Sequence, residues 1–305
     1  MTPILFHYEA SPFAELVRIA LGIKGLEWGS VIVPRVLPKP DQTALTGAYA
    51  RTPMVQLGAD IYCDTGAILP ALEALPGPSL YPLPLGSLHR LVANWAGGPQ
   101  FMAHVGAALG PMPPGAMGED FIRDRQARFG LDMAALGRAA PHLAGQAEVA
   151  ASWLSDTLAD GRAFIGGDAP GAGDCALYAN LWFVKGVPFA ARSADAMLAF
   201  AGVGDWFGRM AAFGAASGRG TRREMSGPDA LAAALAQPPR AISGTVAGPF
   251  VAGMTAAVRQ EGTHDEATTG ALLRCDAGGI ILAREIPGGT VHVHFPRLGQ
   301  VVTPA

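Results

Sequence analysis

The chain is short of cysteine and of charge, and each shortage excludes a class of protein. Its three cysteines, Cys63, Cys175 and Cys275, are widely separated and odd in number, so they form neither a metal-binding pattern nor a disulfide framework. Charged residues make up 15% of the 305 residues, the formal net charge is −3, and no basic block occurs. We therefore expect no binding to nucleic acid.

The chain also lacks a long apolar run. The longest stretch without a charged residue, Leu91 to Gly118, is interrupted by Asn94, Gln100 and several prolines, which makes it a poor membrane span. The N-terminus has neither the basic region nor the small-residue cleavage site of a signal peptide. We therefore expect a cytoplasmic protein without a membrane partner.

What the chain does have is a hydrophobic fraction of 50% and enough length for two or more domains. Near the N-terminus a short apolar strand, Ile4 to Phe6, is followed by Ser11 and Pro12, which are typical of the N-cap and first residue of a helix. Apolar residues then recur at the spacing of one buried helix face, at Phe13, Leu16, Val17, Ala20 and Leu21. The strand therefore delivers the Ser11 hydroxyl to a helix N-terminus, where an anion such as a thiolate is stabilised.

The pattern divides the chain into four segments. Residues 1–76 predict strand, helix, strand, connection, strand, strand and helix, and residues 77–86 form a proline-rich linker. Residues 87–217 predict a helical bundle, and residues 218–305 a short helix followed by β-hairpins. The helices expected in the bundle cover about 87–108, 119–139, 144–160, 172–186 and 194–214. The elements expected in the last segment are a helix at Asp229–Ala236 and strands at Gly270–Cys275, Ile280–Ile286 and Val291–Phe295.

Four short motifs follow one another in the first 217 residues. They are Ser11-Pro12-Phe13-Ala14, Arg51-Thr52-Pro53-Met54, Asp64-Thr65-Gly66-Ala67-Ile68 and Gly173-Asp174. In this order the set resembles the glutathione transferases, and the serine in the first motif is similar to the serine-type branch that includes the plant tau class. The resemblance implies an α/β thioredoxin-like domain followed by an all-α bundle. It leaves residues 218–305 as a β-rich extension with no assigned role.

The resemblance also implies roles for individual residues. Ser11 would donate its hydroxyl hydrogen to the sulfur of glutathione, whereas the local sequence alone favours a simple N-cap. Pro53 would be a cis proline that turns the backbone of Thr52 toward the ligand, and Asp64 and Thr65 would grip the γ-glutamyl end. The full set expected to bind glutathione is Phe13, Lys39, Arg51, Thr52, Pro53, Asp64 and Thr65.

The first motif also narrows the chemistry. Ala14 stands where redox members of the family have a second cysteine, so dithiol chemistry at this turn is excluded. We expect a glutathione transferase in which the bound thiolate attacks a hydrophobic electrophile, and the resemblance implies a homodimer. Two alternatives stay open: a non-catalytic module that binds a ligand or a protein, and a glutathione-dependent isomerase or dehalogenase.

The acceptor pocket is expected between the two domains. Its candidates are Trp95, Met102 and His104, with Phe101 and Trp182 as further possibilities, although each is also compatible with a place in the bundle core. The capping pattern before the fourth motif is incomplete, because Gly171 stands where a serine or threonine is usual, but Asp174 can still accept the Gly171 N–H.

Two histidines in the last segment raise the question of a metal. His292 and His294 are two residues apart in an expected strand and therefore share one face. A metal site needs a third ligand, and His264-Asp265 is the only candidate nearby in the sequence. We therefore expect no metal and interpret the pair as an exposed strand face.

Overall fold

The computed structural model describes residues 1–214 and 220–305. Its first part has the expected order of elements: β1 (Ile4–His7), α1 (Pro12–Lys24), β2 (Trp28–Ile32), α2 (Pro40–Thr46), β3 (Met54–Leu57), β4 (Asp60–Cys63) and α3 (Thr65–Glu73). β1 pairs parallel with β2 and antiparallel with β3, and β3 forms a hairpin with β4. This is the thioredoxin-like arrangement that the sequence predicted.

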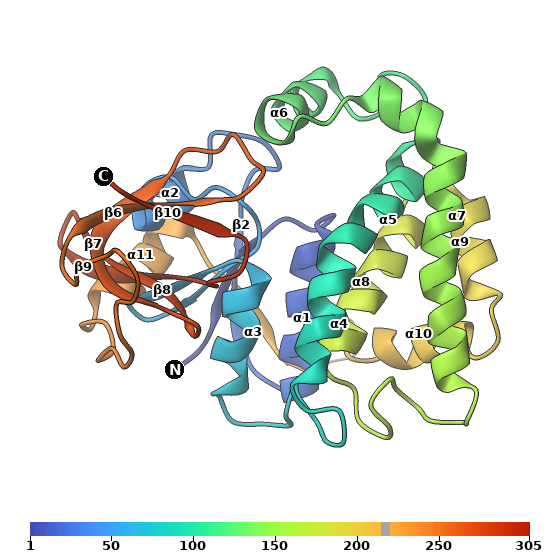
Figure 1. Ribbon diagram of the computed structural model, residues 1–305, viewed down its shortest axis with the longest axis horizontal. Helices are drawn as coiled ribbons and strands as arrows, with labels where there is room; N and C mark the ends of the chain where they lie inside the picture. Colours follow the sequence, from blue (N-terminus) through green and yellow to red (C-terminus); the bar gives the residue numbers. More distant parts are fainter. Residues whose placement is uncertain (215–219) are drawn as a thin grey trace.

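The described residues of the middle part form helices joined by loops, with one isolated β-bridge between Phe164 and Gly167. The helical elements are α4 (Leu88–Gly97), α5 (Pro99–Leu109), α6 (Glu119–Phe129), α7 (Met133–Leu158), α8 (Ala172–Lys185), the 3-10 turn η1 (Pro188–Ala190), α9 (Ala191–Leu198) and α10 (Val203–Ala211). Figure 1 shows them as a bundle on one side of the sheet, with α1 and α3 between the bundle and the strands. α8 agrees with the predicted helix at 172–186.

The expected helix 119–139 is broken at Gly130, which takes a positive φ of 64° and ends α6, while Asp132 caps the start of α7. Three further predicted helix boundaries in the bundle were wrong. The expected helix 87–108 breaks at Gly98, because Pro99 begins a new helix and has no N–H to continue the old one. The expected helix 194–214 breaks before Val203, where Gly202 takes a positive φ of 77°.

The third error lies in α7. The expected gap at 140–143 does not exist, because α7 continues through Pro141. Close packing against α5 explains why. A Cβ on Gly106 would lie 2.5 Å from Cβ of Leu143, and a Cβ on Gly110 would lie 2.5 Å from Cβ of Ala140. This interhelical contact on both sides of Pro141 offsets the lost hydrogen bond.

The last part supplies strands to the same sheet. Its elements are β5 (Arg222–Glu224), α11 (Gly227–Leu235), β6 (Thr255–Gln260), β7 (Thr268–Asp276), β8 (Gly279–Ile286), β9 (Gly289–Phe295) and β10 (Gln300–Pro304). The sequence predicted α11, β7, β8 and β9 but missed β5, β6 and β10. The single ten-stranded sheet has the order β10-β6-β7-β8-β9-β4-β3-β1-β2-β5.

Residues from the last part therefore cover both edges of the N-terminal strands. β9 pairs parallel with β4, and β5 pairs parallel with β2. The new outer strands are poor templates for further pairing, because β5 has three charged residues and β10 ends at Pro304. In Figure 1 the strands β6 to β10 form the side of the molecule opposite the helical bundle.

The sheet is buried on both faces. Alternate residues of β1 point to opposite sides: Leu5 belongs to a hydrophobic cluster with α1, α3 and the bundle, whereas Ile4 and Phe6 belong to a second cluster with α11 and the C-terminal strands. The helix α6 lies apart from the other helices (Figure 1) and joins the two halves of the molecule, because Arg128 pairs with Asp265 at 2.6 Å. Among the described residues, no helix has the length and apolar character needed to cross a membrane.

Candidate functional site

Ser11 caps helix α1, as the sequence predicted. Its Oγ accepts the backbone N–H of Ala14 at 3.2 Å, and Pro12 occupies the first turn, where no N–H is needed. The Ser11 residue is only 2% exposed. Because its oxygen acts as an acceptor in the cap, the hydroxyl hydrogen is available for donation to an anion at the helix N-terminus.

The peptide bond between Thr52 and Pro53 is cis, as expected, and β3 begins at the next residue. The Thr52 hydroxyl accepts a hydrogen bond from Nζ of Lys39 at 2.6 Å. Lys39 is 2% exposed, and its burial, reinforced by the positive charges of Arg128 and Arg125, lowers the pKa of its ammonium group to about 7. A buried lysine with such a pKa can change its charge when an anion binds.

Asp64 caps helix α3 from a strained backbone position. Its carboxylate accepts the N–H of Gly66 at 2.8 Å, and its φ of 75° is the one positive φ at a non-glycine among the described residues. Desolvation raises the pKa of this carboxyl group, while the Gly66 N–H and the charge of Arg51 act in the opposite direction. Thr65 begins the helix, so a carboxylate and a hydroxyl lie together at its N-terminus.

A cavity of about 500 Å³ brings most of the predicted residues together. We call it the α3–α4 cavity, because those two helices form two of its walls. Its lining includes six of the residues predicted from the motifs: Phe13, Arg51, Thr52, Pro53, Asp64 and Thr65. Ser11 and Lys39 are not lining residues, but Ser11 is two positions before Phe13 and Lys39 bonds the hydroxyl of Thr52.

Sequence reasoning missed two walls of this cavity. One is a face of α4 formed by Arg90, Asn94 and Gly97, whose spacing of four and three residues was a readable signal for a shared helix face. The other comes from the C-terminal segment, where no sequence motif indicated a cavity wall. Its lining residues are Gln260, Ala277, Gly278, Pro296, Arg297, Leu298 and Gly299. The charged lining residues are three arginines, Arg51, Arg90 and Arg297, and one carboxylate, Asp64, so the lining carries more positive than negative charge.

The residues predicted for an acceptor pocket lie elsewhere in the bundle. Trp95 stacks on Trp153 with the ring centroids 5.5 Å apart, and Met102 is 43% exposed. His104 is fully buried, its Nδ1 lies 2.9 Å from the carbonyl oxygen of Gln100, and burial lowers the pKa of its imidazole to about 4. Trp95, Met102 and His104 do not line the α3–α4 cavity, and their assignment to an acceptor pocket stays a prediction.

Asp174 is a buried structural carboxylate. It accepts the N–H of Gly171 at 3.0 Å, as expected, and also the N–H of Ile165 at 3.0 Å and the indole N–H of Trp206 at 2.9 Å. These bonds join the start of α8 to α10 within the bundle. The three cysteines are all buried and free, so none forms a disulfide.

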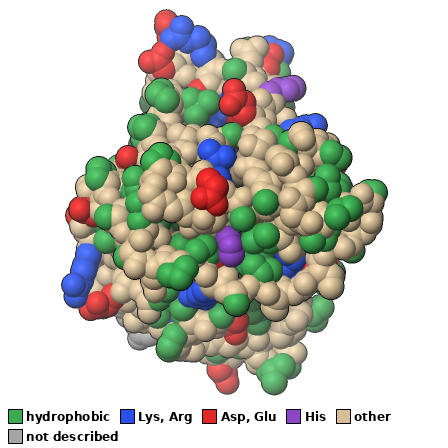
Figure 2. Space-filling view, turned by 90° about the vertical axis from the view of Figure 1, so that its left-hand side faces the viewer, with side chains coloured by type: hydrophobic (Ala, Val, Ile, Leu, Met, Phe, Trp, Pro, Cys, Tyr) green, Lys and Arg blue, Asp and Glu red, His purple; other side chains and the backbone are tan. Residues whose placement is uncertain are grey.

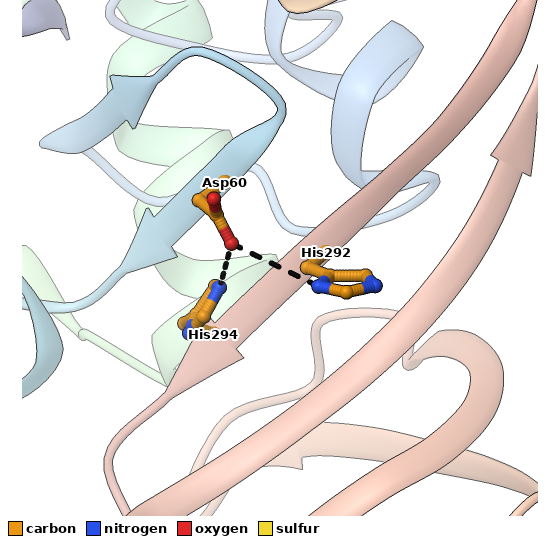
Figure 3. A group of neighbouring side chains, drawn as sticks. All are labelled: Asp60, His292 and His294. Atoms are coloured by element: carbon orange, nitrogen blue, oxygen red, sulfur yellow. Dashed lines mark hydrogen bonds and ion pairs between the residues drawn. The ribbon is translucent and has the colours of Figure 1, made fainter. Parts of the chain in front are cut away.

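The two C-terminal histidines have a partner that the sequence did not suggest. His294 Nε2 lies 2.7 Å from Oδ1 of Asp60, and His292 Nδ1 lies 3.8 Å from the same oxygen. From β9, the His294 imidazole points toward the carboxylate on β4, whereas His292 presents only its Nδ1 to it and the rest of its ring extends away (Figure 3). The expectation of an exposed strand face was wrong, because the two side chains are 13% and 14% exposed. The expected neighbour, Asp265, instead pairs with Arg128.

A second cavity, of about 400 Å³, opens beside this group, and we call it the Asp60 cavity. Asp60, Tyr62, Arg240, Arg274 and His294 are among its lining residues. It shares Gly66, Pro70, Gly278 and Pro296 with the α3–α4 cavity, so the two lie on opposite sides of the contact between α3 and the segment after β9. On the face of the molecule shown in Figure 2, lysine and arginine side chains are scattered and form no continuous basic patch.

Comparison with known proteins places these features in a family. A sequence model described as "Glutathione S-transferase, N-terminal domain" matches residues 5–79. A GST-like protein from Pseudomonas syringae is 32% identical, with a TM-score of 0.80, and the match covers 100% of this chain and 99% of that one. No curated protein matches the sequence.

Two further solved structures resemble a smaller share of the chain. A glutathione S-transferase domain-containing protein from Marinobacter aquaeolei is 24% identical with a TM-score of 0.50, and covers 68% of this chain and 97% of its own. The glutathione transferase GSTFuA3 from Phanerochaete chrysosporium is 15% identical with a TM-score of 0.55, and covers 70% and 97%. About a third of this chain therefore has no counterpart in these two proteins, whereas the Pseudomonas protein matches it throughout.

Proposed function

This chain belongs to the glutathione S-transferase family, and from that premise we propose that its α3–α4 cavity binds glutathione for addition to an electrophilic small molecule. The observation that carries the proposal is the convergence of six motif residues on one cavity. Three separate stretches of sequence, around Phe13, Pro53 and Asp64, supply them. If these residues served only to cap helices or to pack the core, we would not expect all six to line the same cavity.

Each group has a physical task in this proposal. The start of β3 at Thr52 and Pro53 offers backbone groups to an extended peptide, as in strand addition. Asp64 attracts the ammonium of the γ-glutamyl group, and Thr65 with the N-terminus of α3 receives its carboxylate. Lys39 and Arg51 supply positive charge for the other carboxylate. Ser11 donates its hydroxyl hydrogen to the thiolate, whose negative charge the N-terminus of α1 also stabilises.

The charge of the cavity also bears on the acceptor. Arg90 and Arg297 line the walls from α4 and the C-terminal segment, away from the three motifs. Arg90 lies over the ring of Tyr81 at 4.7 Å, which leaves an aromatic face and a cation in the same wall. We therefore propose an electrophile with both an apolar part and an anionic group. This refines the purely hydrophobic acceptor expected from the sequence.

One observation favours a second candidate function. Ser11 is 2% exposed and is not a lining residue of the α3–α4 cavity, although Phe13 is. If its hydroxyl serves only the helix cap, the cavity binds glutathione without activating it, and the protein is a non-catalytic binding module.

Dimerisation and a cytoplasmic location stay predictions. Sedimentation of the full chain tests whether it forms a dimer.

The decisive experiment replaces Ser11 by alanine. Calorimetry measures glutathione affinity, ultraviolet absorbance measures the pKa of the bound thiol, and turnover is followed with activated aryl halides. We expect Ser11→Ala to raise the thiol pKa and to reduce turnover by about 100-fold, the usual cost of losing one donor to a reacting anion. Ser226→Ala is the matched control, because Ser226 caps α11 in the same way by accepting the Asp229 N–H at 3.2 Å.

The possible results separate the two functions. Glutathione binding with an unchanged thiol pKa and no turnover in the native protein favours the binding module. Absence of glutathione binding overturns both. A Ser11→Ala protein that keeps full turnover removes Ser11 from the mechanism, while the remaining cavity residues keep their proposed binding roles.

A further inference from the structure

Asp60, His292 and His294 form a group whose chemistry is distinct from that of the α3–α4 cavity. Their ligand atoms all lie within 4.8 Å of one another. Two imidazole nitrogens and one carboxylate oxygen are a donor set used by zinc and by other first-row transition metals. We propose that these three residues bind a divalent ion of the zinc class. The proposal does not depend on glutathione binding.

The sheet fixes the three ligands in place. Asp60 is paired with His292, and Tyr62 with His294, in the parallel ladder between β4 and β9. The ring of His294 also stacks on Tyr62 with centroids 4.3 Å apart. Ligands on paired strands are held more precisely than ligands on loops, which favours a preformed site.

The carboxylate of Asp60 is oriented by its second oxygen. Oδ2 accepts the backbone N–H of Arg240 at 3.1 Å, and the Arg240 guanidinium Nε lies 3.8 Å away. Oδ1 therefore faces both histidines (Figure 3). This arrangement corresponds to the outer-shell hydrogen bond that usually positions a metal-binding carboxylate.

His292 provides the observation that an ion pair alone does not explain. Its Nδ1 is buried and makes no hydrogen bond of ordinary geometry among the described residues: Oδ1 of Asp60 is 3.8 Å away, and the backbone of Arg240 interacts with the imidazole only weakly. A buried nitrogen without such a hydrogen bond is costly, and coordination to a cation would satisfy it. Donor atoms around one zinc ion are about 3–3.5 Å apart, so small shifts of the two rings suffice.

The position of the group leaves room for further ligands. Asp60 and His294 both line the Asp60 cavity, whose volume is about 400 Å³. Water or a small ligand can therefore complete the coordination from that side. A site with three protein ligands and an open position has the form of a reactive zinc site more than of a closed structural one.

The test uses the full chain without a histidine tag, stripped with a chelator and titrated with Co²⁺. Visible ligand-field absorption reports the coordination, elemental analysis gives the stoichiometry, and Zn²⁺ competition gives the affinity. We expect one ion per chain. His292→Gln and His294→Gln should each weaken binding by more than about 100-fold, because outer-shell changes alone cost up to that much.

His142→Gln is the matched control, since His142 is an exposed histidine on α7 and should not affect binding. Arg240→Gln keeps the backbone N–H but removes a nearby positive charge, so it should tighten binding about threefold or more. Weaker binding in Arg240→Gln counts against the proposal.

A measurement on the native protein covers the case in which a histidine variant does not fold. The chain has seven histidines, and in a nitrogen-15 imidazole spectrum Zn²⁺ should shift two of them into the range of bound ligands. The proposal is overturned if the folded native chain takes up no stoichiometric metal. It is also overturned if a folded His292→Gln/His294→Gln protein keeps native affinity, or if only imidazoles other than these two respond.

Discussion

The α3–α4 cavity and the Asp60 cavity share one wall but differ in the charged and titratable groups that line them. The α3–α4 cavity is lined by three arginines and one aspartate, whereas the Asp60 cavity has two arginines, Arg240 and Arg274, and a buried carboxylate with two imidazoles beside it. The first arrangement suits an anionic peptide and the second suits a cation. They lie on opposite sides of Gly66 and Pro296, so one contact between α3 and the C-terminal segment separates two opposite kinds of site.

The difference also reflects how each cavity is assembled. The motif residues of the α3–α4 cavity lie between positions 13 and 65, within one folded unit. The hydrogen bond between Asp60 and His294 joins residues 234 positions apart. The Asp60 cavity therefore depends on docking of the C-terminal strands, and a disturbance there should leave the motif wall of its neighbour intact.

The largest expected effect is on stability and comes from Asp60→Ala. The change leaves His294 and the Arg240 N–H without their buried acceptor, and we expect a loss of about 3 kcal/mol in the free energy of unfolding. Denaturant titration measures it, with the exposed Asp156→Ala on α7 as control. Glutathione affinity of the folded variant should stay native, and a parallel loss there would break the separation of the two cavities.

Asp64→Asn tests the α3–α4 cavity in the same comparison, through its affinity for glutathione. Asparagine still caps α3, so the fold should survive, but the negative charge that attracts an ammonium is lost. We expect calorimetry to show glutathione affinity about 10- to 100-fold weaker, which corresponds to one charged hydrogen bond. Asp132→Asn is the control, because Asp132 caps α7 by accepting the Ala134 N–H at 2.8 Å, in a different helix. Unchanged affinity in Asp64→Asn would contradict the γ-glutamyl assignment.

Lys39 gives a prediction on pH. Its pKa is lowered from 10.5 to about 7 in the folded protein, so between these values the unfolded chain binds more protons than the native one. The free energy of unfolding should therefore rise with pH in this window, with Lys39 contributing about 1 kcal/mol per pH unit. Unfolding titrations at neutral and alkaline pH should show a smaller rise in Lys39→Met. The exposed Lys185→Met should keep the native slope, and an unaltered slope in Lys39→Met would mean that burial does not neutralise this lysine.

The smallest effect concerns the proposed acceptor. Arg90→Gln removes one cation from the α4 wall, and we expect kcat/KM for an acceptor with a carboxylate to fall about threefold to tenfold. The value for an uncharged acceptor of the same shape should change little. Arg123→Gln, at an arginine on α6 whose side chain is 74% exposed, serves as control. An equal fall for both acceptors would indicate that Arg90 maintains the wall and does not select charge.

The parts of this molecule that local chemistry determines could be predicted from the sequence. Ser11 and Pro12 mark the start of α1, because the Ser11 cap needs only the backbone N–H of Ala14, three residues on. Asp64 marks the start of α3 in the same way through the N–H of Gly66. The hairpin of β3 and β4 and the strands β7 to β9 have apolar runs bounded by turn residues. In these places the residues that decide the structure are neighbours in the sequence.

The helix breaks at Gly98, Gly130 and Gly202 had local signals that were missed, but the other failures occur where distant residues decide. Pro141 indicates a helix break by itself, and only the packing of Gly106 and Gly110 against α7 keeps the helix continuous. In the sequence Asp60 is typical of a turn residue, and no neighbouring residue indicates that it bonds His294. The C-terminal wall of the α3–α4 cavity was missed for the same reason: Pro296 and Arg297 reach it only through the pairing of β9 with β4.

The pairing of β9 with β4 and of β5 with β2 has a consequence for biosynthesis. A ribosome releases the central strands long before the segments that flank them, so a nascent chain exposes the backbone ladder of β2 until β5 emerges and that of β4 until β9 emerges. Premature termination would leave those ladders uncovered for good. Cells making such fragments should accumulate them in aggregates or bound to chaperones, even when every motif of the cavity has been translated.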